Sequence, residues 1–236
     1  MIRILKIIGK SLLVLALTLV LISFGVYFIY NEELPKGEQS SEADLLAEKM
    51  LKAVNHEAYN KTKYLEWSFA GRQHYKWNKQ QQVVVVKWDE TLVNLNIQHP
   101  DSSTVSVNNN EISGTPRFEK IEKAVANFNN DSFWLIAPHK VFDPGTERRI
   151  VSLENGEKSL LVTYSSGGTT PGDSYLWLLE ESGLPKAFKM WVSIIPIGGL
   201  EATWDSWETS ESGVPFPTNH ELLFLDITID NLIAKQ

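Results

Sequence analysis

The chain has 236 residues, a net charge of −7 and no cysteine. The lack of cysteine excludes a disulfide framework, thiolate catalysis and any metal site with cysteine ligands. Roughly 200 residues follow an apolar N-terminal segment, which is enough for one sizeable hydrophobic core and one domain.

The N-terminal segment has the pattern of a membrane anchor. Residues 1–10 contain three basic residues, and residues 11–30 contain no charged residue. Twenty helical residues rise about 30 Å, which matches the hydrocarbon core of a bilayer. A cleaved signal peptide is the alternative, but its apolar region would be shorter and would end in small residues. The bulky end of this run, with Tyr27 and Tyr30, favours an uncleaved transmembrane helix.

The distribution of charge predicts the orientation of the chain. The basic residues precede the span, so residues 1–10 are expected to be a cytoplasmic tail. The predicted location is a bacterial inner membrane, with the rest of the chain in the periplasm. Without the three tail charges, residues 11–236 carry a net charge of −10. An acidic surface disfavours binding to nucleic acid. The predicted partner is the bilayer, which residues 11–30 are expected to contact.

The first external elements are predicted to be a linker and a helix. Residues 31–40 are polar and contain Pro35 and Gly37, which indicates a short linker. Ser41 is a candidate N-cap with an acidic residue three positions later. Apolar residues then recur at helical spacing to about Tyr59. We expect this amphipathic helix to pack on a sheet rather than on a partner.

The rest of the chain predicts an α+β domain covering residues 41–236. An antiparallel meander is expected over residues 64–107, and apolar residues at helical spacing predict an inserted helix over residues 116–128. The later predicted strands cover residues 149–153, 159–164, 174–179, 186–193, 201–209 and 222–229.

The sequence contains no motif that predicts catalysis. The five histidines do not have metal-ligand spacing, and no serine hydrolase elbow occurs. The glycine-rich stretch 164–175 lacks the residues that end a phosphate loop. The residues from His139 to Asp143, near Asp131, form either a polar patch beside a pocket or simply a turn and a cap. We therefore expect no enzyme activity, no cofactor and no metal.

Eight tryptophans are the strongest compositional signal, and most of them lie in predicted strands. They indicate either a thick core or a concave apolar surface for a lipid or another amphiphile. The hairpin of residues 173–192 raises the same question, because Tyr175–Leu179 is apolar on both faces. Half-buried antiparallel strands usually alternate apolar and polar residues, so both faces are expected to meet apolar material.

The stretch SYLWLLEESGLPKAFKMW, residues 174–191, and the order of elements around it resemble the lipoprotein-carrier half-barrels of the LolA/LolB-like superfamily. This resemblance implies an incomplete antiparallel β-barrel, curved around a helical lid, that holds acyl chains. The segments NDSFWLIAPHKVFDPG and PGDSYLWLLEESGLP also resemble bacterial envelope proteins of unestablished activity. Carriers of this superfamily are soluble or tethered through a lipidated cysteine. An anchored chain cannot shuttle, which favours a sensor, holder or accessory factor.

The sequence therefore predicts a membrane-anchored envelope protein that binds a hydrophobic or amphiphilic ligand, such as a lipid or a lipoprotein acyl chain, in a concave sheet. The alternative is a non-catalytic protein-interaction module of an envelope complex. The predicted ligand-binding residues are Trp67, Phe69, Trp88, Trp177, Phe188, Met190 and Trp191.

Overall fold

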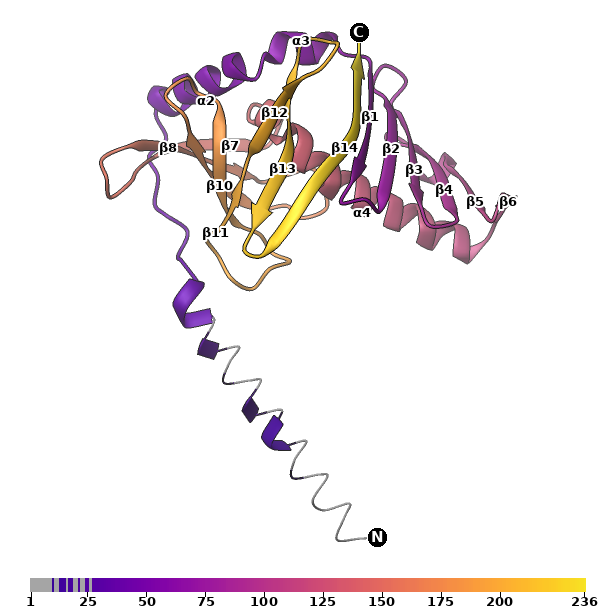
Figure 1. The fold of residues 1–236 in the computed structure, drawn as a ribbon, viewed down its shortest axis with the longest axis horizontal. Helices are drawn as coiled ribbons and strands as arrows, with labels where there is room; N and C mark the ends of the chain where they lie inside the picture. Colours follow the sequence, from indigo (N-terminus) through magenta and orange to yellow (C-terminus); the bar gives the residue numbers. More distant parts are fainter. Residues whose placement is uncertain (1–9, 11–12, 16, 19–20, 22–23, 26) are drawn as a thin grey trace.

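The computed structural model describes residues 10, 13–15, 17–18, 21, 24–25 and 27–236 (Figure 1). The predicted tail therefore lies almost wholly outside the described residues, and the predicted span of residues 11–30 lies partly outside them. No helix within the described residues combines the length and the apolar character needed to cross a membrane. Residues 27–30 are helical, and the Asn31 amide donates to the Tyr27 carbonyl at 2.9 Å.

Within residues 27–236, fourteen strands form one curved, open sheet in which all pairings are antiparallel. The first six are β1 (Tyr64–Phe69), β2 (Gln73–Asn78), β3 (Val83–Trp88), β4 (Thr91–Asn96), β5 (Thr104–Val107) and β6 (Asn110–Glu111). The others are β7 (Thr146–Ser152), β8 (Lys158–Tyr164), β9 (Ser174–Leu179), β10 (Pro185–Trp191), β11 (Leu200–Thr203), β12 (Asp205–Thr209), β13 (Pro215–Leu222) and β14 (Leu225–Lys235).

The strand order is β6-β5-β4-β3-β2-β1-β14-β13-β11-β10-β9-β8-β7, and β12 pairs with β13 beside this path. The last strand, β14, joins the two halves because it pairs with β1, starting from Tyr64 opposite Lys235. The register shifts between Glu66 and Ser68, where β14 carries a bulge. These features confirm an α+β fold with a large curved antiparallel sheet.

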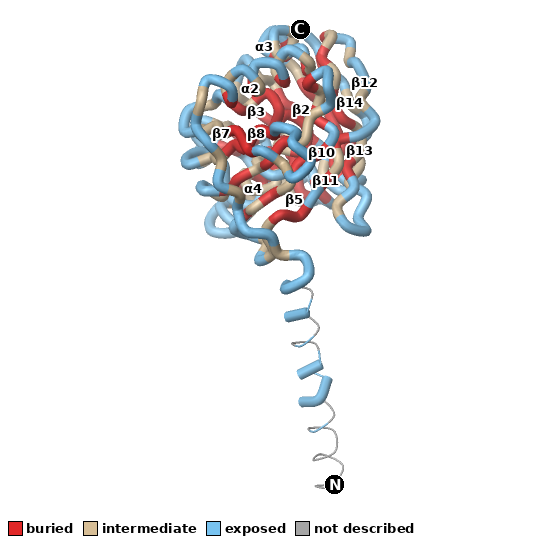
Figure 2. Tube along the Cα trace, turned by 90° about the vertical axis from the view of Figure 1, so that its left-hand side faces the viewer, coloured by how far each residue is buried: buried red, intermediate tan, exposed pale blue. Residues whose placement is uncertain are grey.

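The helices are α2 (Ser41–Ala53), α3 (His56–Lys61), α4 (Thr115–Ile136) and the short 3₁₀ helices η1 (Pro100–Ser102) and η2 (Ala137–Lys140). The apolar stripe of α2, with Ala43, Ala47 and Met50 buried, packs on β7 and β8. The longer helix α4 contacts β4 and β5 as well as β13, so it crosses the sheet (Figure 1). The buried residues gather in the interior of the domain, and the exposed residues lie on its outer turns (Figure 2).

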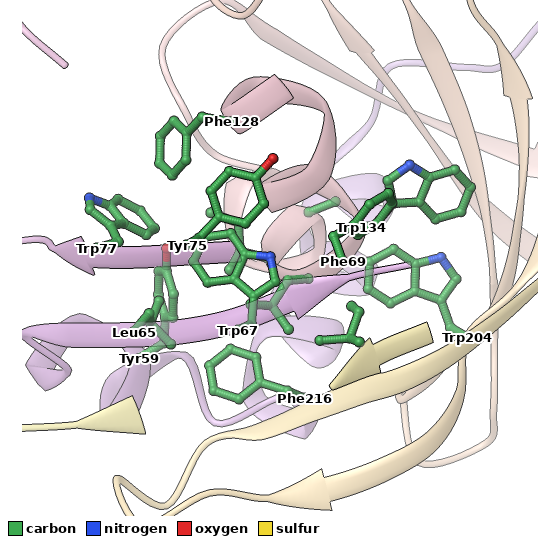
Figure 3. Packing of buried hydrophobic residues seen from close by; sticks show 14 of the residues in the cluster. Tyr59, Leu65, Trp67, Phe69, Tyr75, Trp77, Phe128, Trp134, Trp204 and Phe216 are labelled. Atoms are coloured by element: carbon green, nitrogen blue, oxygen red, sulfur yellow. The ribbon is translucent and has the colours of Figure 1, made fainter. Parts of the chain in front are cut away.

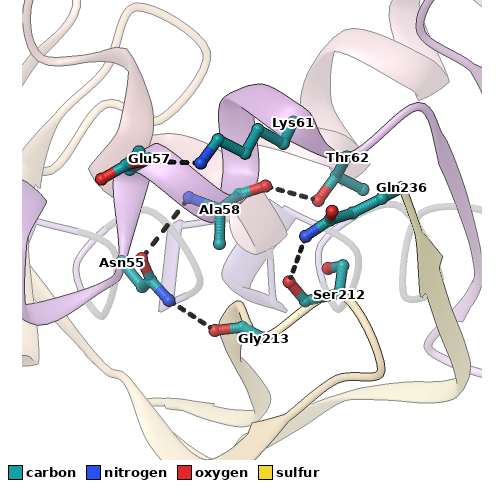
Figure 4. Close-up of polar contacts among 8 residues, drawn as sticks. All are labelled: Asn55, Glu57, Ala58, Lys61, Thr62, Ser212, Gly213 and Gln236. Atoms are coloured by element: carbon teal, nitrogen blue, oxygen red, sulfur yellow. Dashed lines mark hydrogen bonds and ion pairs between the residues drawn. The ribbon is translucent and has the colours of Figure 1, made fainter.

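The predicted single helix over residues 41–59 was wrong, because the chain breaks it between α2 and α3. Asn55 takes a left-handed conformation with φ of 50°, which asparagine tolerates better than most residues. Its side chain accepts from the Ala58 amide at 3.4 Å and donates to the Gly213 carbonyl at 2.8 Å (Figure 4). The second bond ties the break to the β12–β13 turn, a contact that helical spacing alone cannot predict.

The inserted helix α4 extends eight residues beyond its predicted end at residue 128. The Asn129-Asn130-Asp131 stretch resembles a helix end, but its tertiary contacts keep it helical. Asp131 is buried and accepts a hydrogen bond from the Tyr75 hydroxyl of β2. Burial raises the pKa of this carboxyl, and the Tyr75 bond opposes that rise. Asp131 is therefore an interior hydrogen-bonding residue of α4 and does not cap a short helix.

The C-terminal strands also differ from the prediction. The predicted strand over residues 222–229 contains a turn, and β13, which precedes this turn, was missed. Pro215 and Pro217 weaken the local signal for a strand, because proline cannot donate a hydrogen bond to a neighbouring strand. Both prolines lie where β13 pairs with β12 alone, since β14 pairs only with Asn219–Leu222. The predicted strand over residues 201–209 is likewise two strands, β11 and β12, separated at Trp204.

Candidate functional site

Six of the seven predicted ligand-binding residues lie in the main hydrophobic core. Trp67, Trp88, Trp177, Phe188 and Met190 are at most 4% exposed, and Phe69 is 9% exposed. They come from strands in both halves of the sheet. The structure therefore brings these six residues into one interior, and Trp191 lies elsewhere.

Side chains of the protein itself fill this interior (Figure 3). The Trp67 ring stacks on Tyr75 with centroids 4.6 Å apart, and Phe128 of α4 lies 6.3 Å from Trp67. In the other half, Trp177 meets Phe188 edge-on at 5.3 Å. The six residues are therefore core residues, and Phe128 of α4 packs beside the Trp67–Tyr75 pair.

Four buried indole N–H groups in this core have no hydrogen-bond acceptor among the described residues: those of Trp67, Trp77, Trp177 and Trp204. Buried tryptophan N–H groups usually have a partner. An unsatisfied buried donor costs on the order of 1–3 kcal/mol. The core is therefore formed by apolar side chains, but these four indole N–H groups could still donate hydrogen bonds to an oxygen atom.

Trp191 lies on the opposite face of the β9–β10 hairpin. It packs there with a second, smaller cluster formed by Val151, Leu161 and Leu176. Its indole N–H donates to the Glu32 carbonyl at 2.8 Å. The second face of the hairpin is therefore covered by the segment that follows the predicted anchor, not by a ligand.

This covering segment is bound to the domain at two places. At the first, Asn31 and Glu32 dock on the β10–β11 loop. Gly198 donates to the Asn31 side chain at 2.9 Å, and the Glu32 amide donates to the Gly198 carbonyl at 2.9 Å. The Lys189 ammonium lies 2.7 Å from the Glu32 carboxylate. We call Asn31, Glu32, Lys189, Trp191 and Gly198 the linker dock.

The second attachment is at the edge of the sheet. Glu38 pairs with Ile150 of β7 through two backbone hydrogen bonds of 2.9 and 2.8 Å. A Cβ at Gly37 would lie 2.6 Å from Arg149 Cβ, so a glycine is needed for this close approach. Residues 31–40 therefore lie on the sheet and do not form a free linker, and they cover the exposed edge of β7.

The stretch from His139 to Asp143, which the sequence left as either a polar patch or a turn, begins in the packed interior. His139 is 5% exposed, and its ring stacks on Tyr59 with centroids 4.1 Å apart. His139 Nδ1 lies 3.3 Å from His56 Nδ1. The Lys79 ammonium lies 3.5 Å from the centroid of the Tyr59 ring. Asp143 forms an ion pair with Lys140.

The same surroundings lower the pKa values of the basic groups in this cluster. Burial, followed by the charges of His56 and Lys79, holds the His139 pKa well below its usual range. Burial also lowers the Lys79 pKa to about 8. Neutral, stacked rings therefore join α3 to η2. Lys79 of the β2–β3 turn packs against the same rings.

Two open depressions lie along the N-terminal half of the sheet, with volumes of about 410 and 450 Å³. His74 borders both. Its Nδ1 lies 2.8 Å from the Ser68 hydroxyl, which also accepts from the Asn231 amide at 3.1 Å. Sequence analysis missed this Ser–His pair, because the two residues meet across a turn and belong to no motif.

The Ser–His pair lacks two features of a nucleophilic site. Ser68 is only 4% exposed, and the described hydrogen bonds give His74 no carboxylate partner. A catalytic base is normally oriented by such a third group. Within the described residues, no three His, Asp or Glu side chains are grouped to hold a metal ion. We therefore interpret the pair as satisfying the polar groups of the β14 bulge.

Comparisons with known proteins give only a weak structural similarity. No family model and no curated protein matches this chain. Among solved structures, the chain is similar to a DUF1329 family protein from Desulfovibrio piger ATCC 29098, with 11% sequence identity and a TM-score of 0.39. The match covers 83% of this chain and 93% of that chain.

Replacement of Gly198 by alanine should detach the linker. The new Cβ would lie 2.4 Å from Trp191 Cδ1 and 2.8 Å from the Glu32 carbonyl. We expect trypsin to cleave the full chain after Lys36 at least tenfold faster in this variant. Gly168→Ala is the control, because no atom lies within 4 Å of its new Cβ, although Gly168, unlike Gly198, has a positive φ that alanine strains. Equal cleavage rates in both variants would contradict the dock.

A second prediction concerns the buried histidine of β13. His220 is fully buried between Trp134 and Trp204, and its Nδ1 lies 2.8 Å from the Thr203 carbonyl. Burial lowers its pKa from 6.5 to about 4. The unfolded chain therefore binds a proton in this window that the folded chain does not, and stability falls as the pH drops below 6.5.

In detergent, the free energy of unfolding of the full chain should fall between pH 7.5 and pH 5. His220→Asn keeps a donor for Thr203 but does not titrate, so it should reduce this fall by about 2 kcal/mol. His99→Asn removes an exposed histidine and serves as the control. An unchanged pH dependence for His220→Asn, measured by urea unfolding, would be inconsistent with a neutral buried ring.

Proposed function

We propose that the chain is a single-pass inner-membrane protein of a bacterial envelope whose periplasmic domain is a non-catalytic binding module. The observation that supports the anchor is the exposure of its apolar side chains. The large apolar residues described between positions 13 and 30 range from 41% exposed for Tyr27 to 77% exposed for Phe28. Such residues are stable only in an apolar environment that the domain does not provide.

The distribution of charge supports the orientation. The three basic residues of the tail favour the cytoplasmic side, and the residues directly after the span, Asn31-Glu32-Glu33, include no basic residue. The linker dock holds the domain directly beside the end of the anchor. We further propose that the curved sheet with α4 across it is an incomplete barrel whose helix acts as a permanent plug.

The first candidate ligand is another protein of the envelope. The support is the filled interior, in which α4 already covers the aromatic face of the sheet. Apolar side chains that remain available to a partner are on the outside, among them Leu45 and Phe118. A module that presents outward surfaces suits an accessory subunit held at the membrane.

The second candidate ligand is an amphiphile, and the four unpartnered indole N–H groups favour it. An ester or headgroup oxygen beside Trp177 or Trp204 would accept the hydrogen bonds that the described residues do not. Such a ligand would have to displace α4, which loses the contacts of Phe128 and Trp134 with the sheet. This cost is the reason for ranking the amphiphile second.

Topology can be tested directly because the chain has no cysteine of its own. A cysteine introduced at Asn155, in an exposed turn, should react with a membrane-impermeant maleimide in spheroplasts. A cysteine introduced at Ile2 should react only after the membrane is permeabilised. The reverse pattern, or reaction at both sites before permeabilisation, would disprove the proposed orientation.

The nature of the ligand is tested by native mass spectrometry of the chain after mild detergent extraction, with lipid analysis of the same sample. A stoichiometric protein partner is the expected result. A stoichiometric amphiphile that is lost in Trp177→Phe, which removes only the indole N–H and some ring area, would favour the second candidate instead. Recovery of the chain alone from the native membrane would count against both candidates.

A further inference from the structure

The tip of the β13–β14 hairpin has a composition that folding does not explain. Leu222 pairs with Leu225, so Leu223 and Phe224 form a two-residue turn. Leu223 has a φ of 57°, in the left-handed region. Two-residue hairpin turns with a positive φ at the first position only prefer glycine there, because a bulky side chain is strained in that conformation. Here the two positions carry a branched aliphatic residue and an aromatic residue.

Neither side chain gains anything from the domain in return for this strain. Leu223 is 60% exposed and Phe224 is 87% exposed. Local conformational preference and burial would both place polar or small residues at this tip. The Leu-Phe pair therefore indicates an apolar environment outside the folded domain.

The strand register places this tip beside the loop that carries the linker dock. Ala202 of β11 pairs with Leu222 in antiparallel orientation, so the chain beyond Leu222 runs toward the Gly198 end of β11. The β10–β11 loop at that end carries Ile194, which is 69% exposed. We call Ile194, Leu223 and Phe224 the apolar tip.

The linker dock relates the apolar tip to the predicted anchor. Gly198 is bonded to Asn31 and Glu32, and Asn31 directly follows the apolar run that ends at Tyr30. The hairpin lies at the end of the domain from which the N-terminal segment leaves (Figure 1). A bilayer that receives the anchor would therefore meet this end of the domain first.

The lack of charged residues in the apolar tip indicates which kind of membrane contact it can make. Residues 192–199 and 222–225 contain no charged residue, and the hairpin tip is flanked by Glu221 and Asp226. Attraction to anionic headgroups cannot contribute here. Large apolar side chains at a membrane surface bind instead by entering the boundary between headgroups and acyl chains.

We propose that the apolar tip inserts into the outer leaflet of the bilayer beside the anchor, so that the domain touches the membrane at a second point. This inference rests on the proposed membrane anchoring. It predicts contact with uncharged, zwitterionic lipid that does not depend on salt.

The experiment uses the full chain reconstituted into phosphatidylcholine vesicles, with an environment-sensitive fluorophore on one introduced cysteine. A probe at Phe224→Cys should shift to the blue and be quenched by lipids brominated near the headgroup end of their acyl chains. Glu211→Cys is the matched control. It is exposed in the turn at the other end of β13, roughly 25 Å away along eight strand residues, and should remain unquenched.

A probe at Leu21→Cys separates failure of this inference from failure of the anchor. Quenching at Leu21 without quenching at Phe224 would overturn the apolar tip and leave the anchor intact. Absence of quenching at Leu21 would overturn the anchor, whatever the Phe224 probe reports. A blue shift at Phe224 that grows with protein density, without quenching by lipid, would show that a second copy covers the tip, which also overturns the inference.

A turn-optimised variant tests the strain argument. Leu223→Gly combined with Phe224→Asn should leave the urea midpoint unchanged or raise it, because glycine suits the positive φ of the first turn position. The same change should reduce lipid quenching of a probe at Ile194→Cys at least twofold. A lowered midpoint would mean that the Leu-Phe pair serves the fold, and undiminished quenching would mean that the hairpin does not hold the loop at the membrane. Either result overturns the proposal.

Discussion

The packing of α4 across the curved sheet is the interaction on which the rest of the domain depends. Phe128 meets Trp67 and other aromatic rings of the N-terminal half, while Trp134 meets Phe188 of the C-terminal half at 5.4 Å. The two halves are otherwise joined chiefly by one strand pairing, between β1 and β14. An open sheet of this size curls readily, and a helix that contacts both halves fixes its curvature. It also fills the hollow that the curvature creates.

Much of the fold could be predicted from the sequence, because the strands of the N-terminal meander and the hairpin at residues 174–191 carry strong local signals. Three features could not be predicted, since tertiary contacts override local preference there. Asn55 breaks a helix through its bond to Gly213, Asp131 prolongs α4 through Tyr75, and β13 tolerates two prolines because it pairs on one side only at that point. The first two contacts join residues far apart in the chain, and the third depends on which neighbouring strands reach the prolines.

The candidate site was harder to predict than the fold. Aromatic residues on strands have the same pattern whether they face a ligand or a helix, so the sequence could not distinguish Trp177 in a core from Trp177 in a binding surface. Trp191 was predicted with them, yet it lies on the other face and holds the linker. The signal that could have identified the dock is the Gly198-Gly199 pair, because adjacent glycines allow another backbone to approach closely.

The linker dock fixes the orientation of the domain relative to the start of the linker. A free polar linker of ten residues would have an end-to-end distance of roughly 17 Å and would let the domain present any face to the bilayer. The bonds at Gly198 and the pairing at Ile150 remove that freedom. In the membrane-anchored arrangement that we propose, one side of the domain would face the bilayer permanently, and the exposed Leu223 and Phe224 would lie there without the risk of association that they would bring elsewhere. Residues that violate local structural preferences are often found at functional positions. The Leu223-Phe224 turn violates two of them, the preferred backbone conformation and the preferred burial, on the side of the domain that carries the linker dock.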